Sequence, residues 1–168
     1  MLGYFVAKER GQADVTLAAL AMRLGSVGIP VAGAVQVNSG SCEGRDCDMD
    51  LLILGTGRRI RISQNLGAHS DGCRLDPGGL ETAVGLVGAA LNASPAPRLL
   101  IVNKFGRQEA EGRGFRPLIG EALARGTAVV TAVGADYLPA FAEFAGGMEE
   151  RLAPDEGALF DWCAGVAA

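Results

Sequence analysis

The sequence lacks the features that mark several classes of protein. No apolar run approaches the roughly 20 residues that a membrane helix needs, and there is no internal repeat or long block of like charge. The first ten residues have neither the basic start nor the long apolar stretch of a secretory signal. We therefore expect a soluble, cytoplasmic protein with no membrane partner.

Clustered basic residues are also missing, because the net charge is −4 and the arginines are dispersed. We therefore do not expect a nucleic-acid partner. The four cysteines are even in number, but in a chain of this type they need not form disulfides. With 168 residues, 49% of them hydrophobic, the chain can bury one ordinary core, which predicts one domain over residues 1–168.

What the sequence does contain is an alternation of strand-like and helix-like segments. Asp14 is the expected N-cap of the first helix, and Asp76 with Pro77 starts a later one. The patterns predict strands at 2–7, 29–37, 99–102 and 127–133, helices at 14–24, 77–92, 115–125, 137–150 and 155–164, and an antiparallel hairpin over residues 50–63.

Strands separated by helices of this length need right-handed crossovers. We therefore predict a three-layer α/β fold, with a mainly parallel sheet, helices on both faces and the hairpin as an antiparallel addition. Ligands of such sheets bind beyond the carboxyl ends of the strands. The loops after those ends are therefore the places to search for a site.

The order of these segments resembles the small P-loop nucleoside triphosphatases related to the archaeal THEP1 type. The stretches DCDMDLLILGTGRRIRISQNLG (46–67), GCRLDP (72–77) and LLIVNKFGRQEAEGRGFR (99–116) resemble the bacterial proteins grouped as domain of unknown function family 2478. The resemblance covers nearly the whole chain. It implies a P-loop-like fold and an association with either triphosphatase-like activity or molybdenum transport.

The stretch that corresponds to a P-loop is degenerate. A working loop reads G-x-x-x-x-G-K-[ST], in which the lysine reaches the terminal phosphates and the hydroxyl holds magnesium. In KERGQADV (8–15) only Gly11 is a glycine, Asp14 stands in place of the lysine, and Thr16 offers a hydroxyl one position late. Replacing the lysine by an aspartate turns attraction to a phosphate charge into repulsion. For two unit charges about 4 Å apart this interaction is about 1 kcal/mol in water, or roughly 4 kcal/mol at an effective dielectric of 20.

The end of the predicted strand at 99–102, where P-loop triphosphatases hold magnesium, also differs from the working pattern. Asn103 and Lys104 stand where the resemblance places an acidic pair, and a protonated lysine cannot coordinate a cation. These two losses together argue against ordinary metal-assisted triphosphate hydrolysis, and the chain is not expected to be an enzyme of that kind.

Lys104 could instead move positive charge to the opposite wall of the site. With the helix start nearby, a cationic pocket for another anion is one interpretation. A solvated loop with local ion pairs is the other, and Asp14 is first of all a helix cap. The candidate ligand-binding residues are Lys8, Arg10, Gly11, Asp14, Ser39, Ser41, Arg45, Asn103, Lys104, Arg107 and Glu109.

The loop after residue 38 contributes to this set because hydroxyl and glycine-rich loops bind oxyanions through hydrogen bonds. Ser39 and Ser41 supply hydroxyls and Arg45 one cation. Molybdate is the ligand that the family context suggests. No residue pattern separates molybdate from phosphate or sulfate.

A second group of residues could bind metal. Cys42, Cys47, His69 and Cys73 are a chemically sensible set for zinc, although no C-x-x-C pair is present. A disulfide or buried thiols are the alternatives. Cys163 lies in an apolar segment and is expected in the core.

The sequence thus favours a degenerate P-loop-like domain that binds an oxyanion or another small ligand, with a link to molybdenum homeostasis. One alternative is a nucleotide-binding or nucleotide-hydrolysing enzyme with an altered site. Another is a scaffold that binds a protein partner, for example a second copy in a homodimer. Exposed side chains at Phe105 or Trp162 would favour the scaffold.

Overall fold

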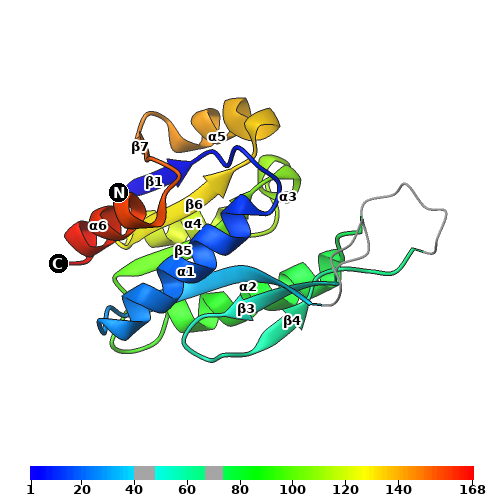
Figure 1. Ribbon diagram of the computed structural model, residues 1–168, viewed down its shortest axis with the longest axis horizontal. Helices are drawn as coiled ribbons and strands as arrows, with labels where there is room; N and C mark the ends of the chain where they lie inside the picture. Colours follow the sequence, from blue (N-terminus) through cyan, green and yellow to red (C-terminus); the bar gives the residue numbers. More distant parts are fainter. Residues whose placement is uncertain (40–47, 67–73) are drawn as a thin grey trace.

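The computed structural model describes residues 1–39, 48–66 and 74–168, and these residues form a seven-stranded sheet with helices packed on it (Figure 1). The strands are β1 (Leu2–Phe5), β2 (Val31–Ser39), β3 (Asp48–Ile53), β4 (Arg59–Arg61), β5 (Leu99–Phe105), β6 (Ala128–Val133) and β7 (Glu149–Arg151). The helices are α1 (Gln12–Ser26), α2 (Pro77–Leu91), α3 (Arg107–Ala110), α4 (Arg116–Ala124), the short 3₁₀ helix η1 (Ala135–Tyr137), α5 (Leu138–Ala145) and α6 (Glu156–Ala167).

The strand order in the sheet is β4-β3-β2-β5-β6-β1-β7. All neighbouring pairs from β2 to β7 are parallel, whereas β3 runs antiparallel to both of its neighbours. The expected hairpin over 50–63 is thus confirmed as β3 and β4. After β1 the chain crosses to β2 through α1 on one face of the sheet. After β6 it crosses to β7 through α5 on the opposite face. The sheet therefore has a topological switch point between β1 and β6.

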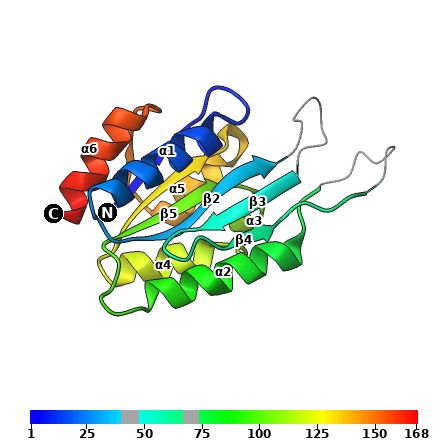
Figure 2. The same ribbon diagram turned by 60° about the horizontal axis from the view of Figure 1, so that its bottom comes forward.

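Helices cover both faces of the sheet, as predicted (Figure 2). The core on one face joins the sheet to α2, α4 and α5, and the core on the other joins it to α1 and α6. The strand β5 contributes to both, because Leu100 and Val102 face the first core and Leu99 and Ile101 the second. This is the three-layer α/β arrangement expected from the sequence, and it fixes β5 at the centre of the molecule.

Close packing of β2 on β5 depends on one glycine. Gly33 has φ of 137°, and a Cβ atom there would lie 2.0 Å from the carbonyl oxygen of Ile101. A side chain at this position would push the two strands apart. The glycine therefore permits the parallel pairing that ends at Ala34 and Val102, just before the polar end of β5.

The start of α1 differs from the prediction. The helix begins at Gln12 with Gly11 as its N-cap, at φ of 78°, so Asp14 lies inside the first turn and is wrong as a cap. Its side chain is buried instead. The other predicted cap is confirmed, because the Asp76 carboxylate accepts a hydrogen bond from the Gly78 N–H at 3.0 Å.

Two further elements differ from the sequence prediction. The helix expected over 137–150 ends at Ala145, because Gly146 and Gly147 adopt positive φ values of 59° and 87°. Glu149–Arg151 then forms the edge strand β7 beside β1. The loop expected after β5 contains the one-turn helix α3. No helix in the part of the chain that the structure describes is both long enough and apolar enough to cross a membrane.

Candidate functional site

The carboxyl end of β5 is built around Asn103, whose side chain is buried. Its Oδ1 accepts a hydrogen bond from the backbone N–H of Gln36 at 2.8 Å, and its Nδ2 donates to Asp14 Oδ1 at 2.8 Å. The side chain thus extends the β2–β5 pairing beyond Val102 and ties the sheet to the first turn of α1. Both polar groups of the amide are therefore used within the protein.

The loop between β1 and α1 is closed by a side chain of its own helix. Gln12 Oε1 accepts hydrogen bonds from the backbone N–H groups of Lys8 at 2.7 Å and Glu9 at 3.4 Å. In a phosphate-binding loop such amides point at the ligand. Here the Gln12 side-chain carbonyl oxygen takes the place of the ligand, and the Asp14 carboxylate lies two residues further along, in the same first turn of α1.

A cavity of about 250 Å³ opens at the same edge of the sheet, on the face covered by α2. Its walls come from the strands of the hairpin, from the start of α2 and from the segment after β5. The residues around it are Gln36, Met49, Leu51, Ile62, Arg74, Leu75, Leu80, Asn103, Lys104, Gly106, Arg107, Gln108, Glu109 and Phe115. Apolar atoms form most of the exposed wall.

Lys104 is the cation best placed to meet a ligand there. Its side chain is exposed at the cavity, and no carboxylate among residues 1–39, 48–66 and 74–168 lies within ion-pair distance of it. Arg107, by contrast, donates from Nε to Glu111 Oε1 at 2.9 Å. The ammonium of Lys104 is therefore available for an anion without breaking an existing ion pair.

Glu109 holds the segment after β5 in shape. Its two carboxylate oxygens accept hydrogen bonds from the backbone N–H groups of Gly106 at 3.1 Å and Phe115 at 3.0 Å. Burial raises the pKa of Glu109 above its ordinary value of 4.5, although these backbone hydrogen bonds work in the opposite direction. The carboxylate thus closes the loop that carries Arg107 and Gln108 to the cavity.

The structure brings together only part of the predicted ligand-binding set. Asn103, Lys104, Arg107 and Glu109 all line the cavity. The remaining described candidates, Lys8, Arg10, Gly11, Asp14 and Ser39, are not among the residues around it. Lys8 and Arg10 are exposed on the loop before α1. Their convergence with Lys104 on one anion therefore stays a prediction.

The other candidates lie outside the described residues. Ser41 and Arg45 of the proposed oxyanion loop are among them, as are the four residues of the proposed zinc site, Cys42, Cys47, His69 and Cys73. Within the described ranges no group of three or more His, Cys, Asp or Glu side chains could hold a metal ion. The zinc site stays a proposal.

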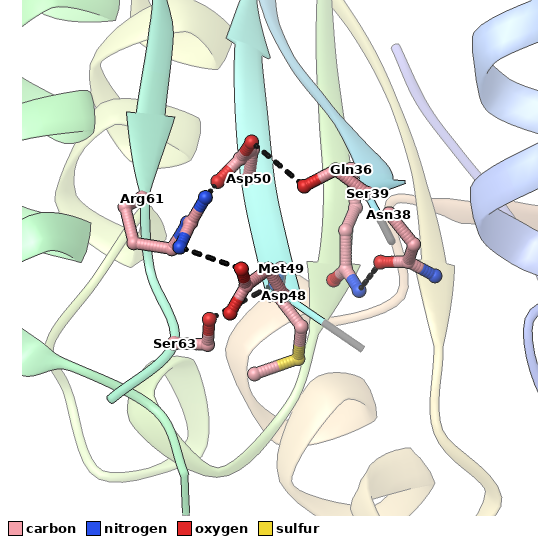
Figure 3. Close-up of polar contacts among 8 residues, drawn as sticks. All are labelled: Gln36, Asn38, Ser39, Asp48, Met49, Asp50, Arg61 and Ser63. Carbon is pink, nitrogen blue, oxygen red and sulfur yellow. Dashed lines mark hydrogen bonds and ion pairs between the residues drawn. The ribbon is translucent and has the colours of Figure 1, made fainter. Parts of the chain in front are cut away.

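Sequence reasoning missed an ion pair on the opposite face of the hairpin. Arg61 Nε contacts Asp50 Oδ1 at 2.5 Å and Arg61 Nη1 contacts Asp48 Oδ2 at 2.9 Å, as Figure 3 shows. Ser39 Oγ donates to Asp50 Oδ2 at 3.5 Å. The signal was available, since Asp50 lies directly opposite Arg61 in the antiparallel register. The hydrogen bond with Asp50, with the nearby charge of Asp48, raises the pKa of Arg61 above its ordinary value.

The apolar candidates are buried rather than exposed. Phe105 is fully buried and packs edge-on against Phe141, with ring centroids 5.1 Å apart. Trp162 is half-buried and its Nε1 donates to Glu150 Oε2 at 2.9 Å. Neither side chain therefore meets the condition that favoured a partner-binding scaffold. Cys163 lies in the core as expected, where burial raises the pKa of its thiol to about 12.

Comparisons with known proteins place this chain in a sequence family. The family model described as a protein of unknown function, DUF2478, matches residues 2–162. The chain is also 36% identical over 149 residues to the molybdenum import ATP-binding protein ModC 2 of Bradyrhizobium diazoefficiens. That alignment covers 89% of this chain but 16% of the relative, so the chain spans about a sixth of its length. No solved structure matches the chain.

Proposed function

The chain belongs to the DUF2478 family, and from that premise we propose that it binds a small anionic ligand at the carboxyl edge of the sheet, without metal-assisted triphosphate hydrolysis. The observation that carries the proposal is Lys104, an exposed ammonium at a preformed cavity with no carboxylate partner among the described residues. A concave site with apolar walls and a few polar groups is the usual form of a small-molecule site.

The loop before α1 supports the second half of this proposal. Tight triphosphate binding needs free backbone amides, a lysine and a magnesium ligand. Here Gln12 occupies two amides, Asp14 replaces the lysine, and Asn103 has both amide groups engaged. The protein's own side chains therefore satisfy the groups that would otherwise bind phosphate and metal.

We further propose a role in molybdenum homeostasis, with molybdate as the first oxyanion to test. The support is the printed name of the relative, which is a molybdenum import ATP-binding protein. Since this chain matches about a sixth of that relative, the activity of the whole relative is not carried over. Ligand binding by the matched segment is the narrower statement, and it can be tested on this chain alone.

Thermal unfolding tests the proposal. An anion that binds only the folded state raises the free energy of unfolding by about 2.7 kcal/mol at a hundredfold excess over its Kd. Molybdate, tungstate, sulfate and phosphate are compared at matched ionic strength, because screening acts on all four alike. We expect at least one to raise the melting temperature.

Two variants localise the effect. Lys104→Ala should abolish the shift while changing the melting temperature of the free protein little, since the side chain is exposed. Arg98→Ala removes a cation just before the other end of β5 and should respond as the wild type does. An equal response from all three proteins, or no response to any small anion, contradicts the proposal.

A further inference from the structure

The cavity beside Lys104 has walls that suit more than a bare inorganic anion. Six of the side chains around it are apolar, and they come from β3, from residues just after β4, from the start of α2 and from the start of α4: Met49, Leu51, Ile62, Leu75, Leu80 and Phe115. At about 250 Å³ it is several times larger than the roughly 30 Å³ share of one water molecule.

Most polar groups of this wall come from the end of β5 and the segment after it, and Arg74 adds a further cation from just before α2. Lys104 and Arg107 lie at the end of β5 and the start of α3, and the side-chain amides of Gln36 and Gln108 accompany them. Among the described residues around the cavity, the carboxylate is that of Glu109, which already accepts two backbone hydrogen bonds. The cavity thus combines exposed cationic groups with an apolar wall.

A tetrahedral oxyanion uses only the cationic groups. It would be held by Lys104 and would leave the apolar wall in contact with water. Removing apolar surface from water is favourable in proportion to its area, so a ligand that also covers this wall gains affinity. An aromatic body suits the wall, because it can meet the Phe115 ring and the Met49 sulfur.

We infer that the cavity binds an organic anion, with a flat apolar body against apolar side chains such as Leu75 and Phe115 and one terminal phosphate or carboxylate at Lys104. This inference rests on the proposed function, because it assumes that Lys104 meets an anion. It is a site apart from the degenerate P-loop, since none of residues 8–15 is among those around the cavity. It names the chemical class of the ligand, which the family comparison does not.

Matched pairs of ligands test the class. Phenyl phosphate is compared with inorganic phosphate, and benzoate with acetate, by calorimetry on the whole chain. Within each pair the head group is shared and only the aromatic body differs. We expect the aromatic member of at least one pair to bind at least about tenfold tighter. The aromatic ligand that binds more tightly, phenyl phosphate or benzoate, indicates whether the site prefers a phosphate or a carboxylate as the terminal group.

Three variants locate the binding. Lys104→Ala should weaken the aromatic ligand about tenfold or more, whereas Arg98→Ala should leave its affinity unchanged. Leu75→Trp fills the cavity beside the apolar wall from a half-buried position and should remove the advantage of the aromatic ligand over its own head group. Met49→Phe, also half-buried, serves the same purpose if Leu75→Trp does not fold.

The outcomes separate the two proposals. If phosphate binds through Lys104 but phenyl phosphate and benzoate gain nothing over their head groups, the organic-anion inference is overturned and the proposed function stands. An aromatic advantage that survives both Leu75→Trp and Met49→Phe also overturns the inference, because the body then lies elsewhere. If no organic or inorganic anion binds, both proposals fail together.

Discussion

At the scale of single residues, Asn103 explains how a strand end without acidic residues is stabilised. Its amide accepts from Gln36 and donates to Asp14, so one uncharged side chain joins β2, β5 and α1. A carboxylate at this position would face Asp14 and could not donate to it. Asn103 at the end of β5 and Asp14 in α1 therefore act as a hydrogen-bonded pair, although they are 89 positions apart in the sequence.

Asn103→Ala should lower the free energy of unfolding by about 1–3 kcal/mol, because it leaves the buried Asp14 carboxylate and the Gln36 N–H without their partner. Urea unfolding measures the loss. Asp14→Asn is the matched control, since its side-chain oxygen can still accept from Asn103. We expect a smaller loss there, limited to the favourable interaction of a negative charge with the first turn of α1. Equal losses from the two variants would argue against a specific pair.

Glu109 makes a pH-dependent contribution whose sign follows from its burial. Its pKa in the folded state is raised above the ordinary value of 4.5, so the folded protein holds its proton at pH values where the unfolded chain has lost it. The contribution to stability is therefore fully present below about pH 4.5 and is lost as the pH rises through the folded-state pKa.

Glu109→Gln removes this titration. We expect the difference in unfolding free energy between wild type and variant to shift in favour of the variant as the pH rises from 4.5 towards 7. At every pH the glutamine can accept only one of the two backbone hydrogen bonds, which costs about 1–3 kcal/mol. Urea unfolding at several pH values measures both effects. A difference that stays constant with pH would contradict the raised pKa.

At the scale of elements, the long periodic segments were predictable and the short polar ones were not. The helices around 77–92 and 115–125 and the buried strand after residue 98 follow from apolar spacing and clear caps. The strand Glu149–Arg151 carries three charged side chains and pairs on one edge only, so no alternation marked it. Asp14 was wrongly predicted as the N-cap because the helix is capped by Gly11, three residues earlier, which carries no polar side chain to mark it.

The segment from Gly106 to Phe115 gives an element-scale prediction. Gly112 and Gly114 both have positive φ, at 85° and 59°, but a Cβ at Gly114 would lie 2.3 Å from Glu109 Oε1 while one at Gly112 meets nothing within 4 Å. Alanine at either position carries the cost of about 1–3 kcal/mol for left-handed backbone. Gly114→Ala should cost about a further 1–3 kcal/mol, because it displaces the Glu109 hydrogen bonds.

Thermal or urea unfolding of the two alanine variants measures that difference. Both variants place an alanine at a positive φ, so Gly112→Ala serves as the control for the backbone strain in Gly114→Ala. If the variants lose equal stability, the close approach of Gly114 to Glu109 does not constrain the loop. If Gly114→Ala also weakens anion binding, the loop is needed to present Arg107 and Gln108 at the cavity.

At the scale of the whole molecule, the sequence pointed to the edge of the sheet at which the cavity opens but not to the face of the sheet on which it lies. Lys104 and the loop before α1 lie at the same edge because β1, β6 and β5 all run in the same direction. The cavity, however, opens towards α2, on the face away from α1. Its apolar wall depends on the register of β3 and β4, and side-chain contacts between distant segments set that geometry.

The same arrangement predicts a weak response to nucleotide. ATP with magnesium should bind poorly and turn over negligibly, because Asp14 repels the terminal phosphates, Gln12 occupies the loop amides and Asn103 offers no charged ligand to the metal. Calorimetry with and without magnesium, together with a phosphate-release assay, measures both quantities. The informative control is Lys104→Ala. If a nucleotide binds only at the cavity, this variant should bind it more weakly than the wild type does, and by the same factor with and without magnesium. Micromolar, magnesium-dependent binding that Asn103→Ala abolishes would instead show that the altered loop still holds a triphosphate, and the chain would then be a nucleotide-binding protein.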